Sequence, residues 1–263
     1  MRTIRTMRQL SFMVSVALLG CGGSGASSGT GGNGGTGTGA GGTSAAGSSG
    51  GGTTGGGGNS AGANSFEPMS VGATWSYATT VTGDGGTVSG TKVVTVEASE
   101  PVPGRAGITA WRTHTVVPSA EDQLTWQAET STAIVRHRDE VYATGSVTST
   151  GLLSVSSYAQ FKLRIDVTPA NLATGATYTE SFTETVMDAT GTSSSSKPFA
   201  WKVINGAESI TVPAGTFTAV HLQKSNGNSG AIDKDYWFAL GVGKVKETSN
   251  AGRTELLTTY HIP

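Results

Sequence analysis

Histidines are the residues of this chain best suited to proton transfer or metal binding near neutral pH. The chain has four, each far from the others: His114, His137, His221 and His261. None lies in a His-x-His or His-Glu-x-x-His pattern, and none has a neighbouring cysteine, which are the spacings that metal sites use. We therefore expect no metal site, and we interpret each histidine as a polar residue on the solvent side of a strand.

Two short stretches match catalytic motifs in part. Ser194-Ser195-Ser196-Lys197 satisfies Ser-x-x-Lys, but it lies in a serine run and not at the start of a buried helix. His137-Arg138-Asp139 is similar to a kinase catalytic loop, but the asparagine, glycine-rich loop and strand lysine of that site are missing. We therefore expect no catalytic residue and no enzymatic activity. A hydrolase would need a nucleophile and a base brought together from distant strands.

Charged residues gather at two places. Residues 136–140 form the densest cluster, and we interpret them as the solvated tip of a hairpin. Asp233 and Asp235 flank Lys234 and could contact Ca²⁺, but no calcium-loop spacing follows them. The sequence therefore predicts no cofactor.

The only cysteine, Cys21, follows a short leader. The leader begins with a positive segment that holds Arg2, Arg5 and Arg8, and an apolar segment over residues 10–19 follows. That apolar segment is too short to cross a bilayer, which takes about 20 residues, and is typical of an export signal. We predict a signal peptide over residues 1–20.

Leu18-Leu19-Gly20-Cys21 resembles the lipobox of bacterial lipoproteins. The resemblance implies cleavage before Cys21, a diacylglyceryl group on its thiol and a fatty acid such as palmitate on the new amino terminus. Two or more acyl chains hold a protein on a membrane where one does not. Gly22 stands where an inner-membrane lipoprotein often has aspartate, so the resemblance implies the outer membrane and leaves its periplasmic or surface side open. The alternative is a free thiol after an ordinary signal peptide.

Residues 21–64 are the lipidated cysteine and a low-complexity tether. The 43 residues after Cys21 contain 21 of the chain's 40 glycines, no charged residue and no large apolar residue. Such a segment buries too little surface to offset its ordering entropy, so we expect a disordered linker. As a Gly-rich coil it would span roughly 35–40 Å.

Residues 65–263 form one predicted domain. They carry 14 of the 17 Lys and Arg residues and all 18 Asp and Glu residues, a net charge of −4. No basic stripe occurs, so we expect no nucleic-acid partner. The expected contacts are the membrane, through the anchor at Cys21, and a protein, a polysaccharide or an apolar ligand.

The domain has the composition and alternation of a β protein. In Phe161–Val167 every odd position is apolar and every even position is charged, which predicts one buried and one solvated face. We predict a mainly β fold, a single antiparallel, strongly curved sheet that forms an open barrel or a sandwich. Turns are expected at 83–86, 205–206 and 213–215, and an exposed loop at 188–198. Tyr178, Phe182 and Val186 have helical spacing, but the Thr and Ser between them favour a strand.

Three motifs resemble uncharacterised bacterial exported domains, including the TapB-like group and related domain-of-unknown-function families. They are Pro-x-x-x-Gly-x-x-Trp-x-Tyr at residues 68–77, Val-Pro-Ala-Gly-Thr-Phe at 212–217 and Tyr-Trp-x-Ala-x-Gly-Val-Gly at 236–243. Leu240 stands where the families often have proline. The resemblance implies an antiparallel β fold and brings no activity or catalytic residue.

The aromatic residues of these motifs are the candidate ligand-facing residues: Trp75, Tyr77, Trp237 and Phe238. We expect them to pack in the core, with a groove for an apolar ligand as the alternative. Two functions follow. The first is a membrane-anchored envelope lipoprotein whose non-enzymatic β domain binds a partner or has a structural role. The second is a carrier or chaperone for a lipid-like ligand, which requires an apolar cavity of about 300–1,000 Å³.

Overall fold

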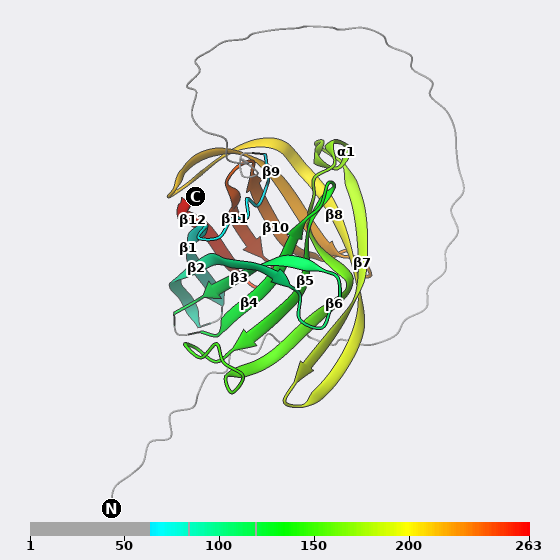
Figure 1. Cartoon of the computed structure of the whole chain (residues 1–263). Helices are drawn as coiled ribbons and strands as arrows, with labels where there is room; N and C mark the ends of the chain where they lie inside the picture. The colour runs from blue at the N-terminus through cyan, green and yellow to red at the C-terminus, as the bar shows by residue number, and fades with distance from the viewer. Residues whose placement is uncertain (1–63, 84, 119) are drawn as a thin grey trace, which may run out of the picture. The chain divides into compact units, whose positions relative to one another are not determined.

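The computed structural model describes residues 64–83, 85–118 and 120–263; the predicted signal peptide, Cys21 and all but the last residue of the tether lie outside them. The described residues form strands and one short helix (Figure 1). In chain order these are β1 (Thr74–Gly83), β2 (Gly86–Pro101), β3 (Thr109–Val116), β4 (Asp122–Glu129), β5 (Ala133–Tyr142), β6 (Leu152–Asp166), α1 (Pro169–Leu172), β7 (Thr177–Asp188), β8 (Gly191–Val212), β9 (Gly215–Asn226), β10 (Ile232–Ala239), β11 (Gly243–Ser249) and β12 (Arg253–His261).

All the strands belong to one antiparallel sheet, in which each strand pairs with its neighbour in the sequence. The sheet also joins its own ends, because β1 pairs with β2 on one side and with β12 on the other. The prediction of a single, strongly curved antiparallel sheet is confirmed. The curvature is complete: where we expected an open barrel or a sandwich, the barrel is closed. Closure pairs the edges that an open sheet would expose.

Two segments differ from their predicted conformation. Residues 188–198, expected as a loop, form the end of β7, a tight turn and the start of β8, with Val186 paired to Ser193. The predicted turn at Asn205–Gly206 lies inside β8, where the register shifts between Val203 and Glu208. In both places residues that by themselves favour turns pair within long β ladders and adopt the strand conformation. The helical alternative for residues 178–186 is also excluded, because they belong to β7.

The other two predicted turns are confirmed. β1 ends at Gly83 and β2 begins at Gly86, and β8 ends at Val212 and β9 begins at Gly215. α1 has four residues, and no helix in the described ranges is long and apolar enough to cross a bilayer.

The alternation of Phe161–Val167 is present, but our interpretation of its faces is wrong. Phe161 is 43% exposed, whereas Leu163 and Ile165 are buried. The charged Arg164 is not in solvent: its side chain is 13% exposed and lines a cavity inside the barrel. Gln160, with φ 66°, lies within β6 just before this segment, where the pairing with β5 shifts register. A closed barrel has an inner face as well as an outer one, so a strand can bury both sets of side chains.

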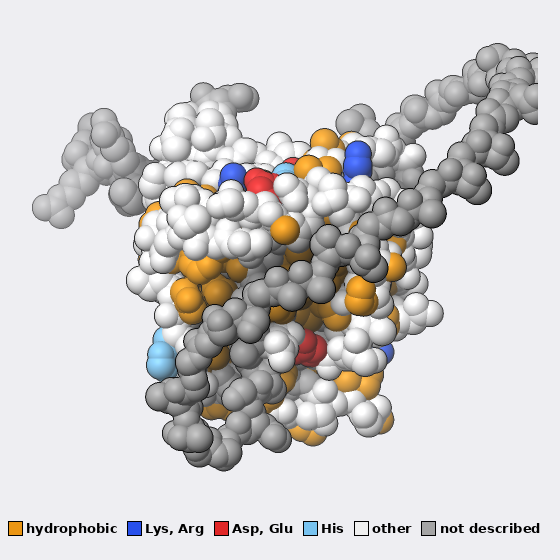
Figure 2. All heavy atoms as spheres, turned by 90° about the horizontal axis from the view of Figure 1, so that it is seen from above, with side chains coloured by type: hydrophobic (Ala, Val, Ile, Leu, Met, Phe, Trp, Pro, Cys, Tyr) orange, Lys and Arg blue, Asp and Glu red, His pale blue; other side chains and the backbone are white. Residues whose placement is uncertain are grey.

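Apolar side chains pack in three clusters. The first surrounds Trp75, Tyr77 and Leu257, where β1 and β12 meet; the second surrounds Trp201, Leu222 and Phe238 on β8–β10. A third, smaller cluster includes Val102, Leu124, Trp126 and Tyr142 near β3–β5. On the face seen in Figure 2, hydrophobic side chains gather around the middle and charged side chains are few.

Gly252, in the turn between β11 and β12, supports the seam that closes the barrel. Its φ is +74°, its carbonyl accepts from Thr82 N–H at 3.1 Å, and a Cβ there would lie 2.2 Å from the Thr82 carbonyl oxygen. We expect Gly252→Ala to lower the free energy of unfolding by about 2–4 kcal/mol, because it adds a backbone collision to the cost of positive φ. Chemical denaturation measures this. Gly145→Ala is the matched control, since Gly145 has φ +68° but nothing within 4 Å. Equal losses for the two variants would contradict the packing of the seam.

Candidate functional site

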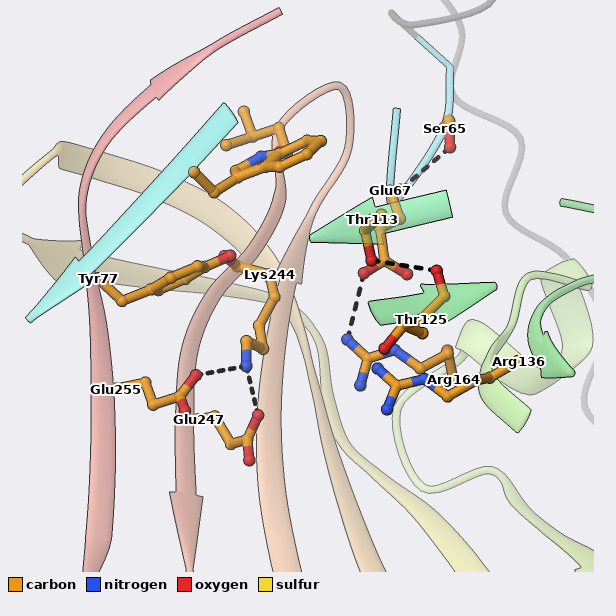
Figure 3. Close-up of polar contacts among 12 residues, drawn as sticks. Ser65, Glu67, Tyr77, Thr113, Thr125, Arg136, Arg164, Lys244, Glu247 and Glu255 are labelled. Atoms are coloured by element: carbon orange, nitrogen blue, oxygen red, sulfur yellow. Dashed lines mark hydrogen bonds and ion pairs between the residues drawn. The ribbon is translucent and has the colours of Figure 1, made fainter. Parts of the chain in front are cut away.

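The barrel encloses a cavity of about 170 Å³. Side chains from β1 to β6 and from β10 to β12 line it, together with the segment that precedes β1. The apolar lining is Met69, Trp75, Tyr77 and Val94, and most of the rest is charged or polar: Glu67, Lys92, Thr113, Thr115, Gln123, Gln127, Arg136, Arg164, Lys234, Lys244, Glu247, Arg253 and Glu255. This is our candidate site, and Figure 3 shows its central residues.

A network of lysines and glutamates forms one wall of the cavity. Lys244 of β11 donates from Nζ to Glu255 of β12 at 2.7 Å (Figure 3). The same Nζ also donates to Glu247 of β11. Lys92 of β2 donates to Glu255 at 2.9 Å, and Lys234 of β10 donates to Glu247 at 2.9 Å. Glu247 and Glu255 face each other in the β11–β12 ladder, so the strand register brings the two carboxylates together and three lysines hold them.

Two effects compete in setting the pKa values of this network. Burial favours the neutral form of each group, and a neighbouring opposite charge favours the ionised form. Burial favours the neutral form of Glu255, but the charges of Lys244 and Lys92 outweigh it and lower the pKa of this carboxyl to about 2. The same balance holds the pKa of Glu247 well below its usual range. For Lys92, burial and the charge of Lys244 outweigh the two carboxylates and lower its pKa to about 7. Both carboxylates are therefore ionised at neutral pH, and Lys92 is close to half protonated.

A second polar group surrounds Asp139 on β5. Its carboxylate accepts hydrogen bonds from Thr125 at 2.8 Å, from Tyr158 at 2.5 Å and from Arg136 at 3.2 Å. Burial raises the pKa of Asp139, but the charges of Arg136 and Lys162 outweigh that effect and lower it. Burial lowers the pKa of Lys162 to about 8. We had interpreted residues 136–140 as a solvated hairpin tip, and this was wrong: they lie inside β5, and Asp139 is buried.

Arg164 of β6 is the third charged group. It donates to Glu67 at 3.2 Å, and its guanidinium lies over the rings of Tyr236 and Phe238, 5.9 and 5.8 Å from their centroids. Glu67 comes from the segment before β1, which is fixed by a hydrogen bond from Gly241 N–H to the Ser65 carbonyl at 2.8 Å. The chain entering the barrel thus supplies the only acidic partner of Arg164 among the described residues.

The four predicted ligand-facing aromatic residues are all buried, but they separate into different places. Trp75 and Tyr77 line the cavity. Phe238 packs in the second apolar cluster, and Trp237 stacks on His221 with ring centroids 4.0 Å apart. The structure therefore places two of the four at the cavity and two outside its lining.

The three sequence motifs meet at one place. The Trp75 indole N–H donates to the Val242 carbonyl at 2.6 Å, and the Tyr77 hydroxyl donates to the Lys244 carbonyl at 3.0 Å. In the motif at residues 212–217, Ala214 N–H donates to the Leu257 carbonyl at 3.0 Å, and Val212 packs in the same apolar cluster as Trp75 and Trp237. Gly243 has φ +110° and would bring a Cβ within 3.2 Å of the Trp75 indole nitrogen, so a side chain there would be strained. The motif residues fix the wall of the barrel beside the cavity.

One histidine is not on the solvent side of a strand as predicted. His137 is buried, and burial and the charge of Arg105 lower its pKa. His221 lies between Glu208, at 2.9 Å from Nδ1, and Asp235, at 3.1 Å from Nε2. Neither residue is part of the cavity lining. Ser194–Lys197 lies in β8, where its three serines are exposed. Within residues 64–83, 85–118 and 120–263, no group of three His, Cys, Asp or Glu side chains could hold a metal ion.

The cavity differs from the one that an apolar-ligand carrier requires. It is smaller than the expected 300–1,000 Å³ and most of its lining is charged or polar. A second hollow, of about 530 Å³, lies on β7–β9 and offers the aromatic surface of Tyr178 and Trp201 among mostly polar neighbours. The larger hollow has the volume of a ligand site, and the rings of Tyr178 and Trp201 give it apolar surface, but it is open to solvent on β7–β9.

No protein-family model matches the sequence, and no curated protein matches it. Among solved structures, a Parabacteroides distasonis protein provisionally classed as a lipoprotein is similar, with a TM-score of 0.43 and 15% identity over 75% of this chain and 99% of its own. A Bacteroides fragilis protein, provisionally classed as exported and with a YmcC-like fold, has a TM-score of 0.42 and 12% identity over 76% of this chain and 100% of its own.

Proposed function

We propose that this chain is an exported bacterial lipoprotein, anchored through Cys21, whose barrel binds a ligand and catalyses no reaction. The lipobox and its leader support the anchor, and the Gly-rich tether would let the barrel stand off the membrane. Gly22 supports the outer membrane as its location. The observation that carries the binding role is the enclosed, charged cavity at the centre of a rigid, closed sheet.

The state of the cavity's acidic groups supports binding over catalysis. General acid–base catalysis works best with a pKa near the operating pH, whereas Glu247 and Glu255 are held ionised by lysines. Lys92 has a pKa near 7, but its ammonium donates to both oxygens of Glu255. A screen of the purified protein that showed turnover of a glycan, peptide or ester would overturn the non-enzymatic role.

The anchor is tested by replacing Cys21. In a Gram-negative host fed an alkyne-labelled fatty acid, we expect the native chain to carry the label and to sediment with membranes. Cys21→Ser is expected to be unlabelled and to leave the membrane fraction, because the acyl chains supply the membrane affinity. Since Cys21 is the only cysteine, a label that persists in the variant, or a native chain without label, would contradict the anchor. Gly22→Asp is the matched control, which should keep the label.

A further inference from the structure

Two cationic side chains lie next to each other inside the cavity. Arg136 comes from β5 and Arg164 from β6, and their guanidinium groups lie side by side in Figure 3. Each makes one ion pair at 3.2 Å, Arg136 with Asp139 and Arg164 with Glu67. A guanidinium has five N–H donors, so each keeps most of its capacity free.

Unsatisfied polar atoms are concentrated at this place. In the described part of the chain, the Nε atoms of Arg136 and Arg164 are buried and have no hydrogen-bond partner. The Oε1 atom of Gln127, a residue that is 3% exposed, also has none. The same is true of Glu67 Oε2. Both of these oxygens are acceptors, so they call for a donor such as water and not for an anion. The two Nε donors face the protein and not the cavity. The pairs with Asp139 and Glu67 each use one terminal nitrogen of a guanidinium, so among the described residues the other terminal nitrogen of each arginine is left for a ligand oxygen.

The net charge of the cavity lining favours an anion over water as the occupant. Six cations and three carboxylates line it, and Asp139, which pairs with Arg136, raises the carboxylates to four. The cavity therefore keeps a positive excess whether Lys92 is charged or neutral, although residues 65–263 have a net charge of −4. Water can accept from the free donors, but it cannot neutralise two neighbouring guanidinium groups in a region with little solvent.

We propose that the cavity binds a small oxyanion, a phosphate or a compact carboxylate, between Arg136 and Arg164, with the side-chain NH2 group of Gln127 as a neutral donor. This inference rests on the proposed binding function and names its ligand class. Arginine is the side chain that best matches the paired oxygens of phosphate and carboxylate groups. The volume of about 170 Å³ holds five or six waters, which suits a free anion or a head group and not a long acyl chain.

The test is isothermal titration of the full chain in a non-ionic detergent, with inorganic phosphate and with malonate as separate titrants. We expect saturable binding of one equivalent of at least one anion, and none of glycerol, a neutral molecule of similar size. Phosphate binding alone would assign the site to a phosphoryl group, and malonate binding alone to a carboxylate. Saturable binding of neither anion to the native chain would overturn the proposal.

Two variants test where the anion binds. Neither leaves one member of a buried ion pair without its charged partner. Arg136→Lys keeps a cationic partner for Asp139 but loses the planar pair of terminal guanidinium nitrogens, and we expect about tenfold weaker binding. The double variant Glu67→Gln with Arg164→Gln removes both members of one pair, and we expect about hundredfold weaker binding. Lys197→Gln, whose partner is Glu184 outside the cavity lining, is the matched control and should bind as the native chain does.

Native affinity in both cavity variants would place the anion elsewhere and overturn the proposal. Circular dichroism and the melting temperature show whether each variant is folded, and Arg136→Lys alone decides the test if the double variant is not. The titration does not depend on lipidation. A failed titration would contradict the proposed anion ligand. A native chain without the fatty-acid label would contradict the proposed anchor at Cys21.

Discussion

Replacing Glu255 by glutamine is expected to lower the free energy of unfolding by about 3–5 kcal/mol, because it breaks a buried ionic network from one side. Glu255 is 1% exposed and accepts from Lys92 and Lys244. Without its charge, Glu247 alone would face the lysines of the wall. Chemical denaturation at neutral pH measures the loss.

The control for this variant is a pair of the same type near the surface. Glu184 lies 3.5 Å from Lys197, and their side chains are 21% and 26% exposed. We expect Glu184→Gln to cost less than about 1 kcal/mol, since exposed pairs contribute little. If Glu255→Gln cost no more than Glu184→Gln, the interior network would not be the buried structure described above.

The same carboxylate makes stability depend on acidity. Its pKa is lowered from the usual 4.5 to about 2 in the folded state, so the unfolded chain binds the proton first as the pH falls. The stabilisation is therefore complete above about pH 4.5 and is lost as the pH falls towards 2, a loss of about 3 kcal/mol for this group. Denaturation curves at pH 7, 4 and 2.5 should show it, and Glu255→Gln should show a smaller loss. An equal loss in the variant would contradict the lowered pKa.

Trp201→Ala is expected to have an effect of similar size, about 3–5 kcal/mol, through packing. Trp201 is 2% exposed and stacks between Tyr178 and Tyr236, with ring centroids 6.0 and 5.8 Å away. Its indole N–H donates to Glu180 at 3.1 Å, and Lys224 also donates to Glu180 at 2.8 Å. Removing the ring leaves a cavity between two aromatic residues and takes one partner from a buried carboxylate.

Two controls separate packing from the hydrogen bond in the Trp201 experiment. Trp201→Phe keeps a ring and loses the donor, so we expect a loss of about 1–2 kcal/mol. Tyr260→Ala removes a ring that is 42% exposed, and we expect less than about 1 kcal/mol. Chemical denaturation of the three variants gives the order, and a Trp201→Ala loss equal to that of Tyr260→Ala would contradict the packed interior.

The fold class could be predicted from the sequence because it depends on local signals. Alternation, β-branched residues and glycine-containing turns predict strands one at a time, and the turns at 83–86 and 213–215 connect neighbouring strands as expected. Closure depends on the pairing of β1 with β12, which are far apart in the chain. No local pattern contains that pairing, so the distinction between an open and a closed sheet required the structure.

The cavity could not be predicted for a related reason. A charged residue at every second position normally indicates a solvated face, and this rule led us to place Arg164 in water. The density of charge at residues 136–140 led to the same error there. In a closed barrel the same alternation also describes a charged interior. Glu247 and Glu255 become neighbours only through the β11–β12 register. The one sequence signal near the site was the aromatic pair Trp75 and Tyr77, whose shared face proved to be the cavity side.

The most direct test of the anion site is anomalous diffraction from crystals of residues 64–263 grown with selenate, an oxyanion whose selenium can be located. We expect a strong selenium peak inside the barrel, within hydrogen-bonding distance of the Arg136 and Arg164 guanidinium groups. Selenate found only on the outer surface, with waters alone between the two arginines, would contradict it.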